Sequence, residues 1–168
     1  MIKQIYHLTA YKKELSQLLT ECVNEGASIN FLAPLTMEKA EAYWDTVDIK
    51  DTLMVFVAME QEKLVGSVQL ACSEKENGRH RAEIAKVMVH PKFRGRGYAM
   101  QLLKEAERAA VAKGITVLVL DTEKGSSANE LYKKLNYTFA GTIPQFAKSA
   151  RSHQLEATNF YYKQIGSI

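Results

Sequence analysis

The stretch with the clearest chemical meaning is a glycine-bearing turn at residues 94–99, which reads Arg-Gly-Arg-Gly-Tyr-Ala. It lies between an apolar segment, 82–89, and a segment, 97–113, whose apolar positions recur at helical spacing. The first amides of a helix have no carbonyl partner, and the helix dipole places partial positive charge on them. A pyrophosphate satisfies both features, so the turn predicts an anion site made by backbone amides.

The residues of this turn support the same interpretation. Gly95 and Gly97 carry no Cβ, so the backbone can approach a ligand closely. Charge for further phosphate oxygens comes from Lys92, Arg94 and Arg96. The lysine and hydroxyl pair of a P-loop is absent, and Met100 stands where a dinucleotide fingerprint needs its third glycine. The competing interpretation is a solvent-facing basic turn whose glycines serve geometry alone.

Hydrophobic periodicity predicts the elements that hold the turn in place. Helices are expected over 11–22, after Thr36, over 97–113, and after a Ser127–Glu130 capping box, with Asn136 ending the last one. Strands are expected over 2–8, 53–60, 63–72, 82–89, 116–120, 137–141 and 159–164, and segment 142–157 is expected to be a loop. Because 116–120 is apolar on both faces, it predicts a central strand of a mixed α/β fold.

Composition narrows the class of protein. The 168 residues suit a single domain, 1–168, and 46% hydrophobic with 24% charged residues is typical of globular proteins. No apolar run is long enough to span a bilayer and the first residues do not resemble a signal peptide, so we expect a cytoplasmic location without membrane contact. Two cysteines and four histidines show no ligand spacing, so no metal is expected. A net charge of +3 does not indicate a nucleic-acid partner.

Residues 94–99 match the Arg/Gln-x-x-Gly-x-Gly/Ala signature of the GNAT superfamily of N-acetyltransferases, and the expected order of elements matches as well. The chain therefore resembles this superfamily, most strongly over 80–141, and within it 80–83 and 120–123 are similar to the tabtoxin-resistance acetyltransferases. The resemblance implies a mostly antiparallel sheet of six to seven strands flanked by four helices. It also implies a parallel central pair, 82–89 and 116–121, splayed around the cofactor acetyl-CoA.

The resemblance also implies how the cofactor is held. Backbone groups in the first splayed strand would pair with the pantetheine arm, and one amide there would stabilise the developing oxyanion. A β-bulge is expected in this strand, because regular alternation would place Lys86 on the face of Ile84 and Met88. The predicted cofactor-binding residues are Val87, Met88, Val89, Arg94, Gly95, Arg96, Gly97, Tyr98 and Ala99.

Three side chains are candidates for catalysis. Tyr132 corresponds to a tyrosine that the family carries near the cofactor sulfur, and a phenol with an ordinary pKa of about 10 holds a proton to donate at neutral pH. The alternative for Tyr132 is packing in the core. Glu83 and Asp121 lie on the two splayed strands, where either could remove a proton from the amine or only attract a cationic substrate. His90, before Pro91, is expected to shape the end of its strand.

The acceptor that best suits these residues is a primary amine of a small molecule, such as an antibiotic or a toxin, because Glu83, Asp121 and Glu123 favour a cation. An amine of a protein or peptide is the alternative, and it would require an open groove beside segment 142–157. A module that binds CoA or nucleic acid without catalysis is the third hypothesis. Residues that could border the acceptor are Phe31, Tyr43, Trp44 and His153; the alternative is ordinary packing for the three aromatic residues and a solvated loop position for His153. A monomer or a homodimer is expected.

Overall fold

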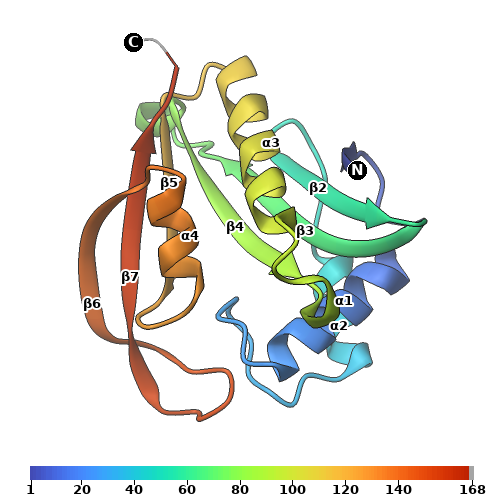
Figure 1. Ribbon diagram of the computed structural model, residues 1–168. Coiled ribbons are helices and arrows are strands. Elements are labelled where there is room, and N and C mark those ends of the chain that lie inside the picture. The colour runs from blue at the N-terminus through green and yellow to red at the C-terminus, as the bar shows by residue number, and fades with distance from the viewer. Residues whose placement is uncertain (167–168) are drawn as a thin grey trace.

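The computed structural model describes residues 1–166, which form a seven-stranded sheet with helices on both faces (Figure 1). The strand order is β1-β2-β3-β4-β5-β7-β6, and among the described strands β4 and β5 make the parallel pair. The strands are β1 (Ile2–Ile5), β2 (Leu53–Glu60), β3 (Lys63–Cys72), β4 (Arg81–Val89), β5 (Val117–Glu123), β6 (Thr138–Lys148) and β7 (Leu155–Gln164). The helices are α1 (Lys12–Asn24), α2 (Met37–Asp45), α3 (Tyr98–Ala112) and α4 (Ala128–Lys134). This arrangement confirms the predicted fold class and element order.

The apolar positions of the sequence fill two cores, one on each face of the sheet. Helix α3 buries Leu102, Leu103 and Ala106 against one face, in a cluster that includes Leu118 and Tyr132. The other cluster joins α1 and α2 to the opposite face, and its members include Leu15, Leu18, Leu19, Trp44 and Val55. Strand β4 contributes residues to both clusters and is held from either face, whereas β5 packs against the α3 side.

Two of the predicted helix signals are confirmed and one is wrong. The Thr36 side chain accepts a hydrogen bond from the Lys39 amide, at 3.3 Å, and so caps α2. Asn136 takes a left-handed conformation, φ +62°, after α4. The capping box at the start of α4 does not form, because Ser127 makes no side-chain capping bond. The amide of Asn129 instead bonds to the Ser126 carbonyl, at 3.2 Å.

The prediction of a loop over 142–157 is wrong. Strand β6 extends to Lys148 and β7 begins at Leu155, so the two form a long hairpin. Pro144 and its polar neighbours resemble a loop in sequence, but an edge strand tolerates a proline because one side of its backbone needs no partner. Irregular pairing between Ile143 and Ala147 absorbs the extra residues. At the other edge, β1 ends at Ile5 and is shorter than the expected 2–8.

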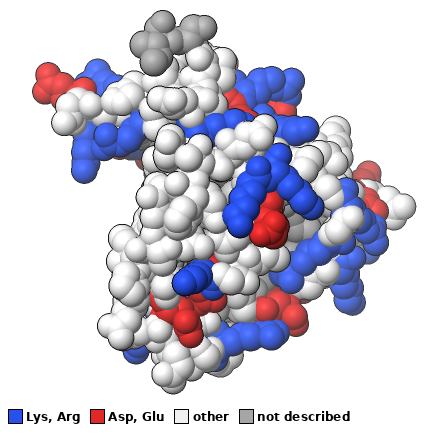
Figure 2. Space-filling model, turned by 60° about the vertical axis from the view of Figure 1, so that its left-hand side comes forward, with Lys and Arg blue, Asp and Glu red and all other residues white. Residues whose placement is uncertain are grey.

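Strand β6 leaves an apolar edge on the surface. Figure 2 turns this side forward and shows a broad area without charged side chains. The exposed apolar residues of the hairpin are Phe139, Ile143, Phe146, Leu155 and Tyr162. Among residues 1–166, no helix is long and apolar enough to cross a membrane.

Asn129, which the sequence did not single out, ties α4 to β5 and β7. Its side-chain amide donates to the carbonyls of Glu123, at 3.0 Å, and Ser126, at 2.9 Å. Its carbonyl oxygen accepts from Asn159, at 2.9 Å, and from the Tyr161 hydroxyl, at 2.7 Å. The residue is buried, so these bonds replace all of the water that its amide would otherwise bind.

Replacing Asn129 by alanine is expected to lower the free energy of unfolding by about 2–4 kcal/mol, because several buried polar groups lose their partners together. Urea denaturation measures the change. The matched control is Glu130→Ala, which alters the next and exposed residue of α4. A loss for Asn129→Ala no larger than that of the control would show that the bonds of Asn129 add nothing to stability.

Candidate active site

The parallel strands β4 and β5 separate part of the way along their length. Their pairing runs from Arg81 opposite Val117 to Glu83 opposite Val119 and stops there, although β4 continues to Val89. A cavity of about 770 Å³ lies where the strands part, bounded also by the β4–α3 turn, α4 and the end of α1. The backbone of β4 therefore presents an edge with no strand partner to this cavity, and the predicted splay is confirmed.

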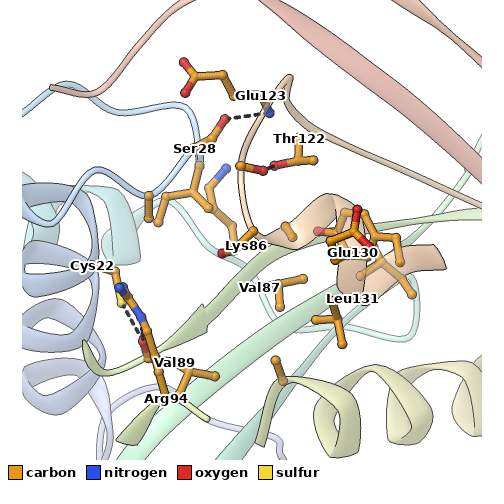
Figure 3. A pocket seen from close by; sticks show the side chains of 18 of the residues that line it. Cys22, Ser28, Lys86, Val87, Val89, Arg94, Thr122, Glu123, Glu130 and Leu131 are labelled. Atoms are coloured by element: carbon orange, nitrogen blue, oxygen red, sulfur yellow. Dashed lines mark hydrogen bonds between the residues drawn. The ribbon is translucent and has the colours of Figure 1, made fainter. Parts of the chain in front are cut away.

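The predicted bulge lies in β4 beside the cavity. Ser67 of β3 pairs with Met88 while Gln69 pairs with Ala85, so a single residue of β3 opposes two residues of β4. Lys86 has φ +53°, and beyond it the side chains change face. Ile84 packs with α3, whereas Met88 is buried in the cluster of α1 and α2. The Val87 and Val89 side chains line the cavity, and the side chain of Met88 does not (Figure 3).

The β4–α3 turn forms an open cradle of backbone amides. Gly95 and Gly97 have φ of +76° and +80°, and a Cβ on Gly95 would meet no heavy atom within 4 Å. The first bond within the helix runs from the Gln101 amide to the Gly97 carbonyl, at 3.0 Å. The amides just before Gln101 are therefore free to bind an anion, and the turn borders the cavity. A ligand with an extended arm attached to a pyrophosphate fits here, with the arm along the β4 edge and the pyrophosphate on the cradle.

Three side chains of the turn already form hydrogen bonds or ion pairs with other parts of the protein. Arg96 pairs with Glu60 of β2, at 3.0 Å, and lies over the Phe93 ring, and it does not line the cavity. Tyr98 donates its hydroxyl to the same Glu60, at 2.5 Å. Arg94 lines the cavity, and its Nε donates to the Val89 carbonyl, at 3.2 Å. Sequence reasoning did not identify Glu60, because this residue lies 36 positions before Arg96 in the chain.

The substitution Gly97→Val tests the cradle. Valine at φ +80° is strained, and its side chain would cover amides at the start of α3. We expect affinity for acetyl-CoA to fall by about 100-fold, measured by titration calorimetry, because the loss removes several charge-assisted hydrogen bonds. The control is Gly114→Val, which imposes the same strain at the other end of α3, φ +76°. Equal losses of affinity in the two variants would mean that strain alone, and no cradle, is responsible.

Glu83 and Asp121 line the cavity from the two splayed strands, as predicted. The ammonium-bearing side chain of Lys86 lines it as well. Burial raises the pKa of Glu83, and the charge of Asp121 raises it further. Burial also raises the pKa of Asp121, although the charge of Lys86 opposes the shift. Burial lowers the pKa of Lys86 against the attraction of both carboxylates. Three titratable groups of opposite sign therefore share this part of the cavity.

Tyr132 reaches the cavity from α4. Its side chain is 4% exposed and packs edge-on against Tyr161, with 5.6 Å between ring centroids. Burial raises the pKa of Tyr132, and the charge of Asp121 adds to the shift, so the hydroxyl keeps its proton at neutral pH. Tyr132 lies in the α3-side core and lines the cavity, so the packing and the catalytic interpretations are compatible.

Contacts between distant segments tie the loop after α1, which borders the cavity, to the rest of the fold. The tip of the β6–β7 hairpin meets the loop after α1, where the Ala33 amide bonds to the Ala150 carbonyl, at 2.8 Å. In the same place His153 Nε2 hydrogen-bonds to the Ala33 carbonyl, at 2.6 Å. Ser28 bridges that loop to β5, accepting a bond from the Glu123 amide, at 3.3 Å (Figure 3). The loop after α1 is thus hydrogen-bonded both to the hairpin and to β5.

The other candidates lie as follows. Phe31 and Tyr43 pack edge-on, 5.2 Å apart, beside the ammonium of Lys86. Trp44 is 1% exposed and belongs to the core. His90 ends β4, where its Nδ1 accepts from the Lys92 amide, at 3.1 Å, and its Nε2 meets Glu21. Within residues 1–166, no group of three or more His, Cys, Asp or Glu residues is placed to hold a metal ion.

Sequence comparison places this geometry in a family. A model of the Acetyltransferase (GNAT) family matches residues 14–137. An uncharacterized N-acetyltransferase from the hisH-hisA intergenic region of Azospirillum brasilense is 29% identical over 113 residues, which are 66% of this chain and 67% of that protein. An acetyltransferase of Yersinia enterocolitica is 35% identical over 65 residues, which are 38% of this chain and less than half, 46%, of that protein.

Solved structures share the whole fold. The ribosomal-protein-alanine N-acetyltransferase of Brucella melitensis has a TM-score of 0.81 at 22% identity, over 98% of this chain and 99% of that one. The Salmonella typhimurium protein yncA, solved with its cofactor acetyl-CoA, has a TM-score of 0.80 at 19% identity, over 100% and 96% of the two chains. The fold and the site define an acyltransferase. The chain belongs to the GNAT family and is an acetyl-CoA-dependent N-acetyltransferase.

Proposed function

We propose that this enzyme transfers the acetyl group of acetyl-CoA directly to a primary amine of a small molecule. The observation that carries the proposal is that the loop after α1, which borders the cavity, is tied to the hairpin by Ala150 and His153 and to β5 by Ser28. A peptide would need a groove that is open along its length, and here the loop after α1 is tied both to the hairpin and to β5. The resemblance of residues 80–83 and 120–123 to the tabtoxin-resistance acetyltransferases, which act on a toxin, favours the same class of acceptor.

The residues at the β4 edge and the β4–α3 turn fit acetyl-CoA. Backbone groups of residues 87–89 would pair with its arm, and the free amides after Gly97 would hold its pyrophosphate, with the charge of Arg94 nearby. When bound, acetyl-CoA supplies an acyl group on a thioester that an amine can attack. An amide of β4 would donate a hydrogen bond to the thioester oxygen, where negative charge develops.

The proton roles are assigned from the charges around the two carboxyl groups. Burial raises the pKa of both, and the charge of Asp121 raises that of Glu83 further. Glu83 is accordingly the general base that takes a proton from the incoming ammonium, and Asp121 is the anion that attracts it. Tyr132 holds a proton on its hydroxyl and gives it to the leaving sulfur, and the second proton that the nitrogen loses as the amide forms restores the hydroxyl.

Two features favour an amine of a protein as the second candidate. The Brucella melitensis neighbour acts on a ribosomal-protein alanine, and apolar residues of β6 are exposed on the surface. The test incubates the protein with acetyl-CoA and either small amines or peptides, and follows the release of free thiol. Turnover with small amines is expected. Turnover with peptides alone would replace the proposal by the second candidate, and saturable CoA binding without any turnover would indicate a sensor.

The remaining expectations about cell biology belong to the same proposal. A small acceptor and acetyl-CoA as donor suit a cytoplasmic enzyme that needs no nucleic acid, no membrane and no metal. A monomer or a homodimer serves equally well, because the residues proposed for catalysis all come from one chain. Gel filtration with light scattering distinguishes the two states.

A further inference from the structure

The strongest unexplained feature of the cavity is Lys86, which neither the cofactor site nor the proton roles use. It stands on the bulge of β4 with φ +53°, a conformation that most residues other than glycine avoid. The bulge turns its side chain away from the α3 core and into the cavity wall beside Val87 (Figure 3). A strained backbone beside a cavity indicates that the direction of this side chain matters to the site.

The surroundings of Lys86 hold a positive charge in place without satisfying its hydrogen bonds. The ammonium lies 5.7 Å from the Phe31 ring centroid and 5.6 Å from that of Tyr43, within the range of cation–π attraction. Glu83, on the same strand, and Asp121, on β5, attract it electrostatically. Over residues 1–166, no side chain or carbonyl accepts a hydrogen bond from this ammonium. Its three donors therefore depend on whatever fills the cavity.

The aromatic pair is itself fixed by the fold. The hydroxyl of Tyr43 accepts a hydrogen bond from the Gln69 side chain of β3, at 2.9 Å. Phe31 packs edge-on against the Tyr43 ring. The two rings thus limit the positions open to the Lys86 stem, and the ammonium is presented to the cavity from a defined direction.

This part of the cavity consequently carries both signs of charge. An acceptor with an amine alone would satisfy Glu83 and Asp121 but would displace water from Lys86 without replacing the lost hydrogen bonds. Leaving a partly buried ammonium without acceptors is unfavourable. An acceptor that also carries an acid group close to its amine satisfies both sides of the site at once, since a carboxylate oxygen accepts strong bonds from an ammonium.

We propose that Lys86 binds an acid group of the acceptor, so that the preferred substrates are zwitterions such as α-amino acids and compounds built like them. The inference rests on the proposed acetylation of small amines and narrows its substrate class. The amine is directed to Glu83 and Asp121, and the neighbouring carboxylate is directed to Lys86.

The test compares L-amino acids with their own neutral amides, such as leucine with leucinamide and phenylalanine with phenylalaninamide, at saturating acetyl-CoA. For the best amino acid, the wild-type kcat/KM is expected to exceed that of its amide by about 100-fold, the usual effect of one charge-assisted bond to a partly buried group. Lys86→Met should abolish this preference by lowering turnover of the acid while the amide is little changed. Lys86→Arg should keep most of it.

The control is Lys104→Met, which removes an exposed lysine from α3 and should retain the full preference. Acetyl-CoA affinity of every variant verifies that it is folded. Equal turnover of acids and amides by the wild-type protein would overturn the role of Lys86 and leave small-amine acetylation intact. Parallel losses on both acceptors in Lys86→Met, with cofactor affinity retained, would also overturn it. Acetylation of peptides alone would remove the inference and the proposed function together.

Discussion

Replacing Tyr132 by phenylalanine is expected to lower kcat by about 100-fold, the usual contribution of a positioned proton donor. The change removes one oxygen from a side chain that is 4% exposed and leaves its ring against Tyr161. Steady-state kinetics and calorimetry together separate the chemical step from binding. Because the hydroxyl acts on the leaving sulfur, affinity for acetyl-CoA should change by less than about twofold, far below the effect on rate.

A matched control for the tyrosine is Tyr6→Phe, which deletes the hydroxyl of a side chain that is 67% exposed. Its kcat should equal that of the wild-type protein. Equal loss of rate and cofactor affinity in Tyr132→Phe would reduce Tyr132 to a packing residue. An unchanged rate would remove it from the mechanism.

Glu83→Gln is expected to lower kcat/KM by about 100-fold or more, because glutamine cannot accept the proton of the ammonium. The same substitution should remove the acidic limb of the pH–rate profile. A base works only when ionised, so the wild-type rate falls as the pH drops through the pKa of Glu83. Because burial and Asp121 raise that pKa, the fall should occur at a higher pH than an exposed glutamate would give.

The profile also distinguishes the two carboxylates. Asp121→Asn removes the negative charge that raises the pKa of Glu83, so its acidic limb should move to lower pH. If Asp121 were the base, that variant would lose the limb altogether and Glu83→Gln would keep it. Glu76→Gln, at an exposed residue before β4, serves as the control and should leave the profile unchanged.

Much of the fold is predictable because its signals are local. The capping threonine, Thr36, and the left-handed residue, Asn136, act through their own backbone neighbours. The bulge was predictable from side-chain alternation along the strand. Without it, Lys86 would lie on the same face as Ile84, and its charge would be buried in the α3 core. The turn at 94–99 is likewise a contiguous signal, because a helix start and two glycines suffice to form the cradle.

The features that the sequence did not predict are set by residues far apart in the chain. Strand β6 forms because β7 pairs with it. From the local sequence alone, the proline within β6 predicts a loop. Asn129 links α4 to β7 only because the fold brings Asn159 and Tyr161 within hydrogen-bonding distance of its carbonyl oxygen. The sequence predicted that Arg96 would contact phosphate, whereas in the structure it pairs with Glu60 of β2. The alternation of side chains along the strand made Lys86 conspicuous in the sequence. Its position beside two aromatic rings and two carboxylates depends on α2, β4 and β5 together.

The central physical claim is that main-chain amides at two places, the open edge of β4 and the start of α3, bind the donor. Hydrogen–deuterium exchange with and without saturating acetyl-CoA measures those amides directly. The account predicts slower exchange in 84–89 and 94–100 when the cofactor is present, with little change in β1 and β2. Saturable binding of acetyl-CoA that leaves exchange in both segments unaltered would contradict it.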